Sequence, residues 1–267
     1  MPPAETLKIL EYIVVITLGL SFGSFATVLA HRGKVFTICA GDEKDSRAAR
    51  SYCPRCKARL GIVDLIPVLS WLAQKGRCRH CSAPISSLYP AIEMAVLLMA
   101  LSYFLVYGLH PFPKMLAACA AFAILAGLFV FDVRSKILPN NLVAVLGVIG
   151  IFYRFWPAYI QAGYETQIIE YGGGAFVYAA FIWIVGWAMQ KFLRKPVLGM
   201  GDVKFFAAAG LWLGISNLGT FCMLSGVFGV IFGLFWRKIK GEAAFPFGPA
   251  LIISFFVLLL LDGSHWP

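Results

Sequence analysis

The sequence predicts an all-helical, polytopic membrane protein with about eight transmembrane helices and a small cytoplasmic insert between the first two. Composition is the first indication: 60% of the 267 residues are hydrophobic and only 13% are charged. A soluble domain usually carries about 25% charged residues. Too few polar side chains remain to cover a globule, so most of the surface must face lipid.

Hydropathy along the chain supplies the second observation, because a helix needs roughly 20 mostly apolar residues to cross a bilayer. Stretches that meet or approach this length are 9–30, 90–109, 114–133, 139–157, 172–192, 203–217, 218–236 and 245–262. Within 203–236, only Ser216-Asn217 and Gly219 mark a turn. We expect the first stretch to be a retained helix and not a cleaved signal peptide, because Glu11 lies near its start and the basic cluster follows it.

The placement of basic residues is the third observation and sets the orientation. The net charge is +10, and 20 of the 23 Lys and Arg residues fall in alternate loops, the exceptions being Lys8, Lys114 and Arg154. Cytoplasmic loops of membrane proteins are rich in Lys and Arg, so residues 31–89 are expected inside and both termini outside. The basic excess therefore indicates the lipid bilayer as partner, with anionic lipid favoured over nucleic acid.

Few carboxylates remain at membrane depth once the loops are set aside, and two of them are expected at the cytoplasmic leaflet. Asp132 ends the third stretch, and Asp202 begins the sixth within Gly199-Met200-Gly201-Asp202-Val203-Lys204. Carboxylates there are costly and normally functional or paired. Two that approach closely share a proton, so one can act as general base on water and the other as general acid. The alternative pairs them with Arg134 and Lys204 as surface ion pairs.

The residues around Asp202 suit a catalytic loop. Gly199 and Gly201 permit a close approach of substrate backbone that a Cβ would block, and Lys204 could orient substrate or tune Asp202.

A second constellation consists of two C-x-x-C pairs, Cys53 with Cys56 and Cys78 with Cys81, separated by a spacer of 21 residues. Four thiolates can close a tetrahedral zinc site with no open position for water, so the predicted zinc is structural. It would stabilise a cytoplasmic insert that lacks a large core. Redox pairs or unrelated cysteines are the alternatives. Glu93, just beyond this insert, either caps its own helix or joins a polar site there.

Three parts follow along the chain: a first transmembrane helix at 1–30, a four-cysteine domain at 31–89, and a seven-helix membrane domain at 90–267 that carries both aspartates.

Taken together, these motifs resemble the type IV prepilin peptidase family of intramembrane aspartic proteases. The likeness runs through nearly the whole chain. It includes Gly23-Ser24-Phe25, the segment from Cys53 to Glu93 with Gly76-Arg77-Cys78-Arg79 and Tyr89-Pro90, Asp132 with Ile137-Leu138-Pro139, Gly199 to Lys204, and Pro246-Phe247-Gly248-Pro249. The chain departs from the family pattern at Thr27, Gly33-Lys34, Arg134-Ser135-Lys136 and Asn140, none of which is an aspartate or a paired cysteine.

The resemblance implies a function in type IV pilus assembly or type II secretion. The enzyme would lie in the bacterial inner membrane and remove the short basic leader of prepilins or pseudopilins at a Gly-Phe type bond on the cytoplasmic side. It would then N-methylate the new terminus with S-adenosyl-L-methionine. The sequence contains no glycine-rich nucleotide loop that would independently indicate a methyl-donor site. Glu93 is therefore a methyltransferase candidate only through the resemblance. The sequence leaves the oligomeric state open.

Two rivals from other classes remain. A proton- or ion-coupled transporter could use the same intramembrane carboxylates as a relay, and Asp-dependent flux in vesicles would favour it. A membrane-anchored zinc scaffold would need neither aspartate, so Asp132→Asn and Asp202→Asn would be silent.

Overall fold

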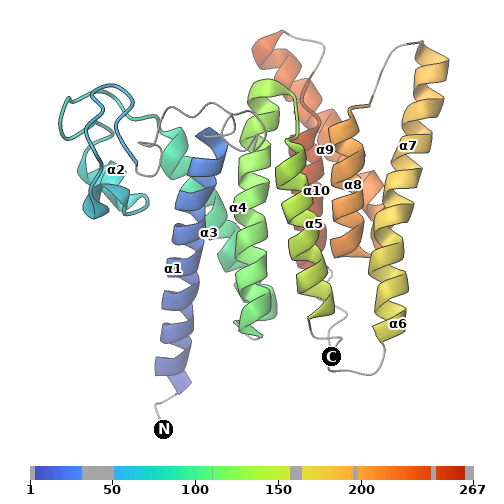
Figure 1. Ribbon diagram of the computed structural model, residues 1–267, viewed down its shortest axis with the longest axis horizontal. Helices are drawn as coiled ribbons and strands as arrows, with labels where there is room; N and C mark the ends of the chain where they lie inside the picture. The colour runs from blue at the N-terminus through green and yellow to red at the C-terminus, as the bar shows by residue number, and fades with distance from the viewer. Residues whose placement is uncertain are drawn as a thin grey trace, which may run out of the picture.

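In a computed structural model, the described residues are 4–31, 51–109, 111–156, 164–194, 198–241 and 245–261, and they form an all-helical bundle without a β-strand (Figure 1). The long helices are α1 (Ala4–His31), α3 (Leu88–Tyr107), α4 (Phe112–Ser135), α5 (Asn140–Phe155), α7 (Gly173–Leu193), α8 (Met200–Leu213), α9 (Leu218–Lys240) and α10 (Gly248–Leu261). Short helical segments are η2 (Ile62–Leu65), α2 (Leu69–Ala73), α6 (Tyr164–Gln167), η4 (Ile168–Gly172) and η5 (Ile215–Asn217). The predicted all-α class is confirmed for these residues.

Five helices are long and apolar enough to cross a membrane, which indicates a multi-pass membrane protein. They span Glu5–Ala30, Leu88–Tyr107, Phe112–Ser135, Glu165–Leu193 and Ile215–Lys240. Two further apolar helices, α5 and α10, are shorter. Helix α8 has 14 residues and so rises only about 21 Å, less than the ~30 Å hydrocarbon core. Eight complete crossings therefore remain a prediction.

The helix before α8 starts earlier than the sequence predicted. It begins at Tyr164 instead of near residue 172, and η4 is a π-helical turn that joins α6 to α7. Glu170 in this turn accepts hydrogen bonds from the backbone N–H and the hydroxyl of Ser216, at 2.9 and 2.7 Å. The acidic segment around Glu170 can therefore be helical, because the Glu170 carboxylate binds the connection between α8 and α9.

That connection lies where the sequence marked a turn. Gly214 ends α8 with a φ of +77°, and the single turn η5 then leads into α9. A positive φ favours glycine. The helix is therefore interrupted at Gly214, just before the Ser216-Asn217 turn that the sequence marked.

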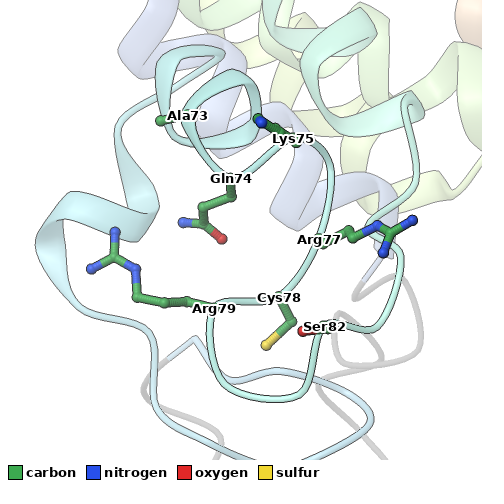
Figure 2. Close-up of a pocket in the computed structure, with 7 residues that line it drawn as sticks. All are labelled: Ala73, Gln74, Lys75, Arg77, Cys78, Arg79 and Ser82. Carbon is green, nitrogen blue, oxygen red and sulfur yellow. The ribbon is translucent and has the colours of Figure 1, made fainter.

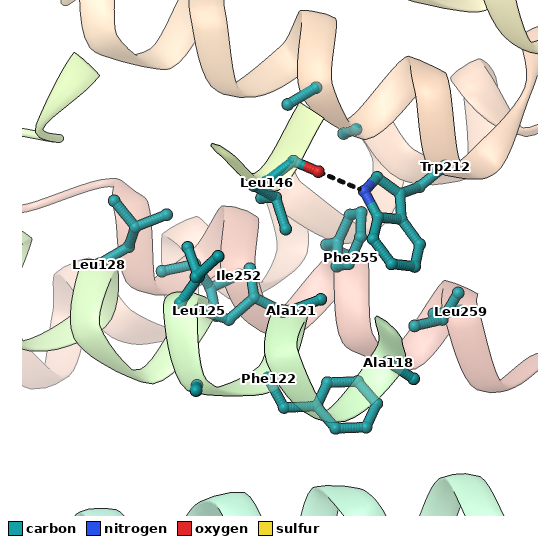
Figure 3. Close-up of a cluster of buried hydrophobic side chains, with 14 of the residues drawn as sticks. Ala118, Ala121, Phe122, Leu125, Leu128, Leu146, Trp212, Ile252, Phe255 and Leu259 are labelled. Atoms are coloured by element: carbon teal, nitrogen blue, oxygen red, sulfur yellow. Dashed lines mark hydrogen bonds between the residues drawn. The ribbon is translucent and has the colours of Figure 1, made fainter. Parts of the chain in front are cut away.

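Helix α4 forms the centre of the bundle, because 67% of its most apolar stretch is buried. Its Leu125 lies in the cluster shown in Figure 3, to which α8 contributes Trp212 and α10 contributes Ile252. Its Phe122 instead packs edge-on against Tyr103 of α3 and Phe256 of α10. Within the cluster the indole N–H of Trp212 donates to the Leu146 carbonyl at 3.0 Å. This bond satisfies the one polar atom of a fully buried tryptophan and ties α5 to α8.

Helices α7 and α8 approach each other at backbone distance. A Cβ placed on Gly210 would lie 2.4 Å from the Gly174 carbonyl oxygen, and one on Gly174 would lie 2.6 Å from that of Gly210. Small residues of this kind drive helix packing in membranes. The contact fixes α8, and therefore its first turn, against the bundle.

The two ends of the bundle differ. At one end, Arg154 donates from Nε to the Trp212 carbonyl at 2.7 Å, which neutralises the C-terminal end of α8. At the other end lies the segment between α1 and α3 that contains α2 and the paired cysteines (Figure 1). Helix α4 ends and α8 begins at that same end, so the fold brings Asp132, Asp202 and the cysteines to one side.

Candidate active site and metal centre

Asp132 lies in the last turn of α4 and is only 4% exposed. The helix ends three residues later at Ser135. The capping residue Lys136 has a φ of +54°, in the left-handed region, and its N–H donates to the Asp132 carbonyl at 2.8 Å. The side chain of Asp132 accepts a hydrogen bond from the backbone N–H of Gly248 at 2.7 Å. Its cost of burial is therefore offset by a direct donor.

Asp202 lies in the first turn of α8, whose N-cap is Gly199. Its N–H donates to the Gly199 carbonyl at 3.0 Å. A Cβ on Gly199 would lie 3.2 Å from Asp202 Oδ2, tighter than an ordinary contact. Gly199 thus leaves room for the Asp202 carboxyl group, whereas the close approach of a substrate backbone stays a prediction.

The two aspartate motifs pack directly against each other. A Cβ on Gly201 would lie 3.1 Å from the Cβ of Leu138 and 3.5 Å from its carbonyl oxygen. Leu138 belongs to the segment that follows Asp132, and Gly201 immediately precedes Asp202. Asp132 and Asp202 therefore both lie near this contact between the start of α8 and the segment that follows α4. Sharing of one proton by the two carboxyl groups stays a prediction.

The alternative of surface ion pairs finds no support in the described part of the chain, where neither aspartate forms a salt bridge with Arg134 or Lys204. Lys204 instead donates from Nζ to the side-chain oxygen of Asn140 at 2.9 Å. This bond joins the first turns of α8 and α5. Lys204 therefore acts on the framework of the site, and tuning of Asp202 or orientation of substrate stays a prediction.

Gly248 was not assigned a role by sequence reasoning, although the motif that contains it was recognised. The signal was present in Pro246-Phe247-Gly248-Pro249, where two prolines of restricted backbone flank a Phe-Gly pair. The pattern could not show that this glycine contacts Asp132, because the sequence does not reveal that α10 and α4 are neighbours.

The four paired cysteines come together as predicted. Their sulfur atoms lie within 4.8 Å of one another, and Cys53 Sγ is 3.9 Å from Cys81 Sγ. Tetrahedral zinc with Zn–S bonds of about 2.3 Å separates its sulfur ligands by about 3.8 Å. The cluster can therefore hold a metal ion, and the donor set fits zinc.

The two halves of this cluster have the same backbone construction. In the first, the N–H of Cys53 donates to Ala58 O and the N–H of Lys57 to Cys53 O, both at 2.9 Å. In the second, Cys78 donates to Ala83 O at 2.8 Å and Ser82 to Cys78 O at 2.9 Å. Backbone N–H groups of Cys56 and Arg55 stabilise the Cys53 thiolate and lower its pKa to about 6. Metal binds the thiolate form of cysteine, so a lowered pKa at this ligand favours metal binding.

A pocket of about 610 Å³ lies beside the second half of the cluster (Figure 2). Its lining residues are Ala73, Gln74, Lys75, Arg77, Cys78, Arg79 and Ser82. The cationic groups of Lys75 and Arg77 suit an anionic group. Arg79 is partly neutralised, because it lies 3.3 Å from Asp64.

Glu93 connects the cysteine-containing segment to the membrane helices. It is 8% exposed, and its Oε2 accepts a hydrogen bond from the Val68 N–H at 2.7 Å. Gly23 of α1 lies against its backbone, since a Cβ there would be 2.8 Å from Glu93 Cα. Glu93 therefore bonds to the N-cap of α2 instead of the N-terminus of its own helix.

Comparisons with known proteins find similar sequences over most of the chain. Residues 17–107 match the bacterial Peptidase A24 N-terminal domain, and residues 119–234 match the type IV leader peptidase family. A prepilin leader peptidase/N-methyltransferase of Aeromonas salmonicida is 32% identical over 282 residues, which cover 98% of this chain and 94% of the relative. One of Burkholderia pseudomallei is 32% identical over 257 residues, 88% and 81% of the two chains. A type 4 prepilin-like proteins leader peptide-processing enzyme of Escherichia coli is 33% identical over 216 residues, 80% and 76%. No solved structure matches.

Proposed function

Because the chain belongs to the type IV leader peptidase family, we propose that it removes the short basic leader from type IV prepilins or pseudopilins with Asp132 and Asp202 as the catalytic pair. The relatives carry names that describe leader-peptide processing. The observation that carries the proposal is the contact of Gly201 with Leu138. It joins residues 63 positions apart at one end of the bundle, close in sequence to Asp132 and Asp202.

The chemistry requires one carboxylate and one carboxylic acid. The ionised aspartate takes a proton from water as the water oxygen bonds to the scissile carbonyl carbon, and the protonated aspartate supplies a proton to the leaving amine. The C–N bond then breaks to give a new carboxyl group and a new N-terminus. Exclusion of bulk water by the bundle strengthens the interaction between the two groups.

The position of the pair suits a membrane-inserted substrate. A prepilin presents its leader in the cytoplasm and its hydrophobic helix in the bilayer, so a Gly-Phe type bond between them would lie at the leaflet. We place the active site, the residues 31–89 and the basic loops on the cytoplasmic side of the bacterial inner membrane, with both termini external. Residues 90–267 would form a seven-helix peptidase domain, and the first helix would lie within 1–30.

Zinc is the metal that we assign to the four cysteines, and its role is structural. Cys53, Cys56, Cys78 and Cys81 would supply all four ligands, which leaves no position for water or substrate. The ion would hold the two halves of the cluster together and give this segment a stability that its few buried side chains, Cys53, Cys78 and Ala83, do not.

The test of the peptidase is cleavage of a prepilin-like peptide by the purified enzyme, followed by mass spectrometry. Asp132→Asn and Asp202→Asn each preserve size but cannot cycle a proton, so we expect cleavage to fall about a thousandfold. Glu165→Gln is the matched control, because it makes the same change of acid to amide at an exposed site on α6. Cleavage by either aspartate variant at the rate of this control would exclude the mechanism.

The same spectra test two further points. A mass gain of one methyl group on the new N-terminus, dependent on added S-adenosylmethionine, would support the second activity, which the names of the relatives indicate. In the rival function as an ion- or proton-coupled transporter, the aspartate variants would abolish flux in vesicles while no peptide is cut.

A further inference from the structure

The contact between Asp132 and Gly248 is held in place from helix α9. Gly248 is the first residue of α10, and a Cβ on it would lie only 2.6 Å from Asp132 Oδ2. Glycine is therefore required for its N–H to reach the carboxyl group at 2.7 Å. The question is what keeps this N–H in register with a side chain from α4, 116 positions away.

Two aromatic residues precede Gly248, and their rings occupy the space beside two glycines of α9. A Cβ on Gly229 would lie 2.9 Å from Cε2 of Phe247, and one on Gly233 would lie 3.0 Å from Cε1 of Phe245. Gly229 and Gly233 are one helical turn apart and share a face. The segment before α10 thus packs on α9 through rings that fit only where side chains are absent.

Phe247 also sets the start of α10. Its carbonyl accepts hydrogen bonds from the N–H groups of Ala250 and Leu251, at 3.0 and 3.3 Å. The ring of Phe247 is fixed on Gly229 and its carbonyl is fixed to the first turn of α10. The adjoining N–H of Gly248 therefore has little freedom, and the position of Asp132 follows from it.

We infer that Gly229 is a positioning residue for the peptidase: by receiving the Phe247 ring it places the Gly248 N–H against the Asp132 carboxyl group and holds that group toward Asp202. The inference rests on the proposed function, since it assumes that Asp132 takes part in cleavage. It adds α9 and the start of α10 to an active site otherwise built from α4 and α8.

The experiment compares two glycines of the same helix. Gly229→Ala forces the Phe247 ring to move, whereas Gly226→Ala introduces the same methyl group where nothing lies within 4 Å. A displacement of well under 1 Å at a catalytic group reduces rate strongly, because about 1 Å can cost a hundredfold. We expect Gly229→Ala to lower kcat about tenfold with KM within about twofold of wild type, and Gly226→Ala to be unchanged.

Rescue distinguishes positioning from loss of fold. Phe247→Leu shortens the group that occupies the space beside Gly229, so the double variant Gly229→Ala/Phe247→Leu should cleave at the rate of Phe247→Leu alone. The thermal unfolding midpoint and metal content are measured on every variant. Gly229→Ala with wild-type kcat would overturn the inference. So would a loss of kcat that Phe247→Leu leaves uncorrected.

The outcomes also separate this inference from the proposed function. If Asp132→Asn is inactive and Gly229→Ala is fully active, the aspartate mechanism stands and the role of α9 is refuted. If Asp132→Asn cleaves normally, the proposed function itself is wrong.

Discussion

The cysteine cluster and the aspartate pair are at the same end of the molecule but are built in different ways. The four sulfur atoms come from a segment of 29 positions, Cys53 to Cys81, whose two halves are each closed by local backbone hydrogen bonds. The two aspartates lie on separate helices, α4 and α8, whose relative position depends on the packing of α4, α5, α8 and α10. One site is set by local geometry, and the other depends on the whole bundle.

This difference predicts that the two sites can be damaged separately. A local cluster should fail when a single ligand is lost, with the helices intact. An assembled site should fail through small shifts at helix contacts, with the metal retained. Glu93 joins the cysteine-containing segment to the membrane helices, because its carboxylate in α3 accepts the Val68 N–H of that segment.

The largest effect is expected from loss of a metal ligand. Cys78→Ser removes one of the four predicted ligands and should reduce bound zinc below about half an equivalent. The effect should be large, because structural zinc contributes on the order of 10 kcal/mol in small metal-dependent folds. Metal analysis and limited proteolysis of purified protein measure the outcome. Cys222→Ser is the control, since this half-buried cysteine lies on α9, outside the cluster. Full metal content in Cys78→Ser would argue against four thiolate ligands.

The second effect should fall on the aspartate pair alone. Gly201→Ala inserts a methyl group 3.1 Å from the Cβ of Leu138, which separates the two aspartate motifs slightly. We expect cleavage to drop about tenfold with zinc content unchanged. Gly219→Ala, where nothing lies within 4 Å, should match wild type. Parallel loss of metal and cleavage in Gly201→Ala would mean that the two sites are not independent.

The same contrast explains how much could be predicted from sequence. The approach of the four cysteines was predictable because spacing along the chain encodes a local site, whereas the zinc assigned to them stays a prediction. For the aspartates, polarity within apolar segments identified Asp132 and Asp202, and the alternation of helices placed them at one end. The Gly248 donor and the Lys204–Asn140 bond were not predictable, because each depends on which helices become neighbours and at what register.

Helix boundaries show the same limit. Hydropathy located every long helix but placed the start of the fifth apolar stretch near residue 172, whereas the helix begins at Tyr164. Polar residues such as Glu170 look like loop in isolation. Their bonds to Ser216 are made across space, and no local pattern reports them.

A third effect should be confined to the cysteine-containing segment. Gly76 has a φ of +67°, and a Cβ there would lie 2.9 Å from the Trp71 ring. Gly76→Ala should destabilise this segment by about 2 kcal/mol, from the left-handed backbone and the displaced ring. Hydrogen exchange of residues 70–85 measures it. Gly61→Ala, with an extended backbone and its nearest neighbour at 3.6 Å, should exchange like wild type.

The smallest effect tests the connection between the two regions. Glu93→Ala removes the acceptor of the Val68 N–H, which costs about 1 kcal/mol for a donor left without a partner. The segment that begins at Val68 should then exchange amide hydrogen faster. Glu93→Gln keeps an oxygen in the same place, so it should restore protection.

Cleavage and methylation by these two variants decide what the connection is for. If Glu93 only anchors the cysteine-containing segment, Glu93→Gln should match wild type in both activities, because an amide oxygen accepts the Val68 bond as a carboxylate does. If Glu93→Gln methylates poorly while cleaving and exchanging normally, the negative charge itself takes part in methylation, and an anchoring role alone is insufficient. Because Asp132 accepts its hydrogen bond from Gly248 of α10 and not from the segment that Glu93 holds, cleavage should remain within about twofold of wild type in either case.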